Sequence, residues 1–125
     1  MAAWFTMLVC NLLIPVIMLV AGKLMEKNTP KKINWVIGYR TARAMKNQDT
    51  WQFAHAVAGS FWWKWGWVSF GAAIVAMLLL LGQPETVVET AGTIIMLLLM
   101  IPLLLVIHHT EKALRNHFDE AGNRR

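Results

Sequence analysis

The sequence predicts an all-α membrane protein with three transmembrane helices, and three observations lead to that fold class. Of the 125 residues, 57% are hydrophobic and only 15% are charged, whereas a soluble domain usually carries about 25% charged residues. Three apolar runs are long enough to cross the roughly 30 Å hydrocarbon layer of a bilayer. The cations lie between and after these runs. We expect a single membrane domain over residues 1–125, with spans at about 2–24, 55–81 and 87–107.

The first run, residues 2–24, is predicted to be a retained helix. A cleaved signal peptide is the alternative, but such peptides begin with a positively charged region, and no lysine or arginine precedes Lys23. Asn11 is the one polar side chain near the middle of the run. At that depth an asparagine is expected to bond a neighbouring helix.

The second and third runs are predicted to form an antiparallel helical hairpin, because the short link between them contains the turn-forming pair Gln83-Pro84. Indole rings favour the headgroup level of a membrane, and small residues let helices approach closely. The lipid-spanning part of the second run, residues 62–81, has a group of tryptophans at its start and also carries a small-residue patch. These are Trp62, Trp63, Trp65 and Trp67, and Gly66, Gly71, Ala72, Ala73 and Ala76.

The distribution of cations predicts the orientation of the spans. Seven lysine and arginine residues lie from Lys23, at the end of the first span, to Lys46, and four follow the third span, while the link between the second and third spans has none. Cytoplasmic segments beside membrane spans carry an excess of Lys and Arg. We therefore expect the N-terminus outside the cell, and the segment 25–54, the tail 108–125 and the C-terminus in the cytoplasm. The tail from Thr110 is predicted to be a short helix that ends near Gly122.

The segment 25–54 is expected to be partly amphipathic. Residues 33–39 are apolar but too few to span a bilayer, so they either lie in the interface plane or form a short re-entrant turn. The residue types favour a helix from Thr41. This helix either continues into the second span or breaks at residues 47–50, with Asp49 or Thr50 capping the next helix. The sequence leaves both alternatives open.

A continuous helix would place residues four apart on one face. Arg43, Asn47, Trp51 and His55 have this spacing, and together they would present a cation, an amide, an indole and an imidazole. Such a row suits an anionic or polar group, for example a lipid headgroup, a peptide terminus or a carboxylate. The alternative is a solvated face that anchors the second span at the membrane surface.

The motifs give little support to catalysis. The sequence has no Ser/His/Asp order, glycine-rich phosphate loop or HExxH pattern. The four histidines match no standard zinc spacing. We therefore expect no metal, no cofactor and no enzymatic activity. Because the cations flank apolar runs, the net charge of +5 is explained by topology and anionic lipid rather than by nucleic acid.

One residue pattern extends from the end of the first span into the second. It comprises Pro30, Asn34, Ile37-Gly38-Tyr39-Arg40-Thr41, Lys46-Asn47, Trp51 and Ala54-His55. In this pattern the chain resembles the SdpI family of small bacterial membrane proteins, which is named for an immunity protein against a secreted peptide toxin. Pro30 stands earlier than in the strictest form of the family motif, and His55 stands where the namesake-like pattern has asparagine.

The resemblance implies a multi-pass protein of the bacterial cell membrane. Without catalysis, it would give resistance to a membrane-active peptide toxin or sense that toxin. Expected partners are membrane lipids, with a peptide toxin, a cytoplasmic repressor or a second copy of the chain as further candidates. A small oligomeric transporter or lipid-handling protein is the alternative, since small-residue helix faces permit dimers. The implied binding residues are Asn34, Gly38, Tyr39, Arg40, Thr41, Asn47, Trp51 and His55.

Overall fold

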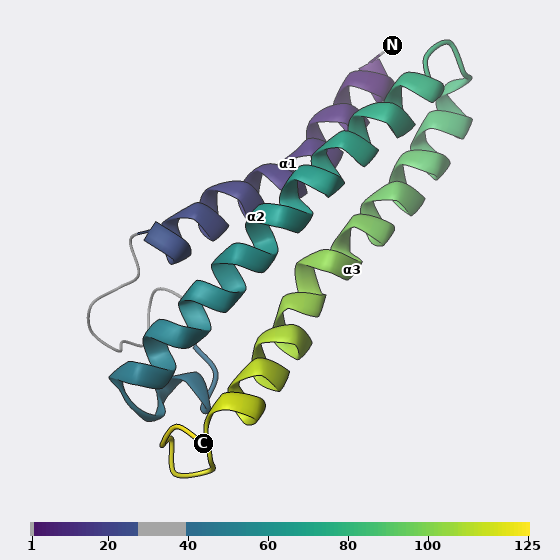
Figure 1. Cartoon of the computed structure of the whole chain (residues 1–125). Helices are drawn as coiled ribbons and strands as arrows, with labels where there is room; N and C mark the ends of the chain where they lie inside the picture. The colour runs from purple at the N-terminus through teal and green to yellow at the C-terminus, as the bar shows by residue number, and fades with distance from the viewer. Residues whose placement is uncertain (1, 28–39) are drawn as a thin grey trace.

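The computed structural model describes residues 2–27 and 40–125, which form three long α-helices and one turn of 3₁₀ helix. The three helices lie side by side in an elongated bundle (Figure 1). The N-terminus lies at the same end of the bundle as the α2–α3 turn, and the C-terminus lies at the opposite end, beside the start of α2. The predicted all-α class and the three helices are confirmed. The elements are α1 (Ala2–Lys27), η1 (Ala44–Lys46), α2 (Gln48–Leu79) and α3 (Glu85–His117).

The helix limits differ from the expected ones at the C-terminal end of the bundle. α2 begins seven residues before the predicted span, at Gln48. The tail does not form a separate helix ending near Gly122, because α3 continues without a break to His117. The chain then reverses, with Gly122 at φ +88° and an isolated antiparallel bridge between Phe118 and Arg124. At the other end, the predicted turn joins α2 to α3 and contains Gly82 at φ +80°.

Two glycines bring α1 and α2 into close contact. A Cβ atom built on Gly59 would lie 2.6 Å from the carbonyl oxygen of Gly22, and one built on Gly22 would lie 2.9 Å from the carbonyl oxygen of Gly59. These separations are too short for any side chain, so the backbones touch only because both positions are glycine. Further along the same interface, Gly66 lies against Leu19. The α1–α2 contact is therefore set by small residues.

Polar side chains join the helices toward the end of the bundle that holds the N-terminus and the α2–α3 turn. Asn11 is fully buried, and its Nδ2 donates to the carbonyl oxygen of Gly92, 3.3 Å away on α3. The Trp4 indole donates to the carbonyl oxygen of Met77 on α2 at 2.7 Å. The prediction that Asn11 bonds a neighbouring helix is confirmed.

The outer surfaces of α1 and α3 are apolar. Both helices are long and apolar enough to cross a membrane. α2 is also long enough, but with its tryptophans and Lys64 it has no 18-residue stretch that is equally apolar. In a soluble bundle these apolar side chains would be buried, yet many are exposed, which suggests a membrane protein. They include Val9, Leu13, Ile17 and Val20 on α1, and Leu97, Leu98, Ile101, Leu104 and Leu105 on α3.

Candidate functional site

Most of the predicted binding residues that the structure describes lie where α2 begins. Asn47 has an extended backbone with φ −157° and ψ 178°, and it is the N-cap of α2. Its Oδ1 accepts from the backbone N–H of Thr50 at 2.9 Å, and Thr50 Oγ1 accepts from the N–H of Asn47 at 3.1 Å. This capping box satisfies two backbone donors that a helix start leaves unpaired. Asn47 therefore starts α2, rather than Asp49 or Thr50.

Asn47 also ties the C-terminal tail to the bundle. Its Nδ2 donates to the carbonyl oxygen of Gly122 at 2.7 Å. A Cβ on Gly122 would lie 2.6 Å from this nitrogen and would displace it, and the left-handed backbone at φ +88° favours glycine there. The amide group of Asn47 thus uses its oxygen to cap α2 and its nitrogen to hold the tail.

An ion pair between Arg124 and Asp49 also joins the tail to the first turn of α2. Arg124 donates from Nε and from one terminal nitrogen to the two carboxylate oxygens of Asp49, each at 2.8 Å. Hydrogen bonding to this carboxylate raises the pKa of the Arg124 guanidinium. The guanidinium also lies 5.0 Å from the ring centroid of Phe118, which is buried. Because the ion pair is exposed to solvent, it orients the tail more than it stabilises the fold.

Trp51 and His55 are fully buried beneath this cap. Their ring centroids lie 4.2 Å apart, one helical turn from each other on α2. His55 Nδ1 lies 2.8 Å from the carbonyl oxygen of Trp51. Since a carbonyl only accepts, Nδ1 carries the proton in this contact. The pair belongs to the packed interior of the bundle end, and neither ring is open to solvent.

The chain before Asn47 forms a tight turn rather than the helix predicted from Thr41. Thr41 Oγ1 accepts from the backbone N–H of Ala44 at 3.2 Å, and η1 follows for a single turn. Thr50 Oγ1 reaches back to the carbonyl oxygen of Ala44 at 3.0 Å. Side-chain hydrogen bonds of this kind compete with helix continuation, and they explain the break at Asn47.

This break changes the predicted row of Arg43, Asn47, Trp51 and His55. Only Trp51 and His55 lie inside α2, and the extended Asn47 separates Arg43 from them. Arg43 is half-buried and pairs with Glu111 on α3, Nε to Oε2 at 3.4 Å. Arg40 is exposed and Thr41 is half-buried. The continuous form of the row is thus excluded. Asn34, Gly38 and Tyr39 lie outside the residues that the structure describes.

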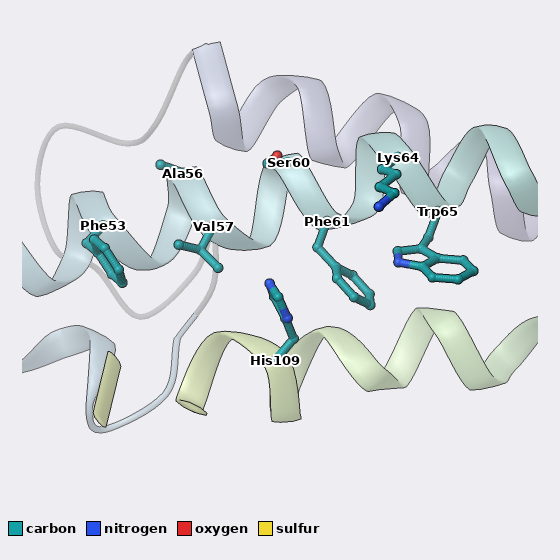
Figure 2. Close-up of a pocket in the computed structure, with 8 residues that line it drawn as sticks. All are labelled: Phe53, Ala56, Val57, Ser60, Phe61, Lys64, Trp65 and His109. Carbon is teal, nitrogen blue, oxygen red and sulfur yellow. The ribbon is translucent and has the colours of Figure 1, made fainter. Parts of the chain in front are cut away.

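A groove of about 540 Å³ opens between α2 and α3, and it holds residues that the sequence did not single out as a site. Figure 2 shows the side chains of α2 along one wall, with His109 of α3 projecting toward them. The ring of His109 stacks on Phe61 with centroids 4.9 Å apart. The spacing Phe53, Val57, Ser60 and Lys64 is a helical i, i+3/i+4 pattern, which could have pointed to this face.

Open surfaces among the described residues are candidates for binding a partner. Within residues 2–27 and 40–125, no group of three or more His, Cys, Asp or Glu side chains is placed to hold a metal ion. The cap region is occupied by its own hydrogen bonds. Among the residues that the structure describes, open surfaces include the α2–α3 groove and a smaller hollow beside Arg43. That hollow, of about 420 Å³, is lined by side chains of both charges: Ala42, Arg43, Lys46, Glu111 and Glu120.

Known proteins resemble part of this chain in sequence. The model of the SdpI/YfhL protein family matches residues 31–109. The uncharacterized protein YfhL of Bacillus subtilis (strain 168) is 39% identical over 67 residues, which are 54% of this chain and 56% of that protein. The chain thus spans about half the length of this relative. No solved structure matches. Because the family model covers well over half of the chain, the protein belongs to the SdpI/YfhL family.

Proposed function

We propose that this protein is a three-span bacterial membrane protein that gives resistance to, or senses, a membrane-active peptide toxin without catalysing a reaction. Family membership suggests an immunity-like membrane protein, and the matched region includes the capped start of α2 and the segment before it. Family membership is the observation that carries the proposal. The apolar outer faces of α1 and α3 support a location in the bilayer, where a membrane-active peptide would be met.

The proposed contact surface lies just before the cap. Arg40 is exposed and Thr41 is half-buried, whereas Trp51 and His55 are buried in the first turns of α2. The buried pair would hold the α2 start in place while the segment around Arg40 contacts the toxin or a cytoplasmic repressor. A cation presented at the membrane surface suits the carboxylate terminus of a peptide or an acidic side chain.

The test is expression of the full chain in a toxin-sensitive bacterium, followed by challenge with secreted membrane-active peptides. We expect survival to rise with the wild-type chain and to fall back with Arg40→Ala. Arg115→Ala is the matched control, since it removes an exposed cation at the same end of the bundle, and it should retain protection. Unchanged killing, with no toxin-dependent change in gene expression, would overturn the proposal. A toxin-dependent change in gene expression without protection from killing would favour sensing over resistance.

A further inference from the structure

Two adjoining hollows form one long groove between α2 and α3, called here the α2/α3 groove. The first has a volume of about 540 Å³ and the second about 470 Å³. Both are bordered by Phe61, Trp65 and His109, so the second continues the first along α3. Figure 2 shows Phe61 and Trp65 turned toward α3 on the same side as His109.

The polar side chains along the groove are basic or neutral. Lys64 borders the first hollow, and His108 and Lys112 border the second. The lining of the two hollows includes no aspartate or glutamate. Lysines from two different helices therefore face one open space, which favours an anionic occupant.

The rest of the lining is apolar and lies nearer the membrane-spanning part of α3. Ile101, Pro102 and Leu105 form this part of the wall, and Ile101 and Leu105 are exposed on the outside of the bundle. Trp62 Nε1 donates to the carbonyl oxygen of Leu103 at 3.2 Å, which sets the tryptophan group at this height on α3. Indole rings mark the headgroup level of a bilayer. The groove thus runs from a cationic end at His108 and Lys112, toward the C-terminus of α3, to an apolar end at the level of the tryptophans.

We propose that the α2/α3 groove binds one anionic phospholipid of the surrounding bilayer. Lys64, Lys112 and His109 contact its phosphate, and an acyl chain lies along Trp65 and Leu105. A bilayer lipid fits this groove because it carries both required parts, a negative headgroup and a hydrocarbon chain. The proposal rests on insertion of α2 and α3 into the membrane, and it does not depend on any toxin.

The experiment uses the full chain purified in a neutral detergent and measures bound lipid by native mass spectrometry. Phosphatidylglycerol and phosphatidylcholine with identical acyl chains are titrated separately. We expect the wild-type protein to retain one phosphatidylglycerol in preference to phosphatidylcholine. Lys64→Gln and Lys112→Gln should each weaken that retention by roughly fivefold, the usual contribution of one lysine at an anionic membrane surface. Lys64→Arg should restore it, because the cation returns.

The matched control is the double variant Lys27→Gln, Lys46→Gln, which removes two exposed cations away from the groove. It should bind lipid like the wild-type protein, and circular dichroism should show every variant folded. Equal retention of the two lipids, or equal loss in the control, would overturn the proposal. Displacement of the lipid by millimolar glycerol phosphate alone would also overturn it, because the site would then recognise a free phosphate. Unchanged killing in the toxin assay would leave these binding results intact.

Discussion

Asn47 combines two tasks in one side chain, and substitutions can separate them. Its Oδ1 caps α2, while its Nδ2 holds the carbonyl oxygen of Gly122. Asn47→Ala removes both bonds and should lower the free energy of unfolding by about 1–2 kcal/mol, the usual cost of losing an N-cap. Asn47→Asp keeps a cap acceptor but loses the donor to the tail. It should therefore retain most of the stability.

Trypsin digestion tests whether Asn47 holds the C-terminal tail against the bundle. Cleavage at Arg115 and Arg124 should become faster in both Asn47→Ala and Asn47→Asp, because each releases the tail. Thermal unfolding in detergent, followed by circular dichroism, should separate the two variants. Asn116→Ala is the control, since Asn116 is exposed at the end of α3, and it should change neither measurement. Equal unfolding temperatures for Asn47→Ala and Asn116→Ala would contradict the capping role.

Much at the level of single helices could be predicted from the sequence, because helix length and apolar content are local properties. The three helices and the α2–α3 turn followed from them. The docking of the tail could not be predicted, since Asn47 and Gly122 are 75 residues apart and no periodicity links them. Residue types also favoured a helix from Thr41, but side-chain hydrogen bonds from Thr41 and Thr50 redirected the backbone.

The predicted small-residue patch also shows that contacts between helices could not be predicted from the sequence. Gly66 is buried against Leu19 on α1, whereas Gly71 is exposed with no atom within 4 Å of an added Cβ. Composition could identify the patch but not the side of α2 that faces α1. The tryptophan group is also divided: Trp62 bonds to α3 and Trp63 lies under Lys23, while Trp67 is exposed. Only the packing of the three helices assigns these roles.

The glycine contact between α1 and α2 gives a direct stability prediction. Gly59→Ala places a methyl group 2.6 Å from the carbonyl oxygen of Gly22, and a backbone atom inside a helix cannot move away cheaply. The two helices must separate, and we expect a loss of about 1–3 kcal/mol, the usual cost of overpacking. Gly71→Ala is the matched control on the same helix and should be neutral or stabilising by up to about 1 kcal/mol. Thermal unfolding in detergent is the measurement, and equal effects of the two substitutions would contradict the close contact.

The three helices together decide whether α2 crosses the bilayer. Taken alone, α2 has no 18-residue stretch as apolar as those of α1 and α3, since tryptophan, glycine, serine and Lys64 interrupt its apolar residues. Yet α2 runs alongside α1 and α3 in the bundle (Figure 1), and its small residues are partly shielded by them. If the flanking helices span the membrane, a helix packed along them spans it too. We therefore expect three crossings, with the cation-rich end of the bundle in the cytoplasm.

Single-cysteine labelling tests this orientation. Cys10 is the sole cysteine, so Cys10→Ala provides a background for Ala2→Cys, Gln83→Cys and Asn116→Cys, all at exposed positions. In intact cells, a membrane-impermeant maleimide should label positions 2 and 83, and it should label position 116 only after permeabilisation. A chain in which α2 fails to cross would place positions 2 and 83 on opposite sides. Labelling of position 116 alone in intact cells would instead reverse the orientation, and the excess of lysine and arginine would then have failed to set it.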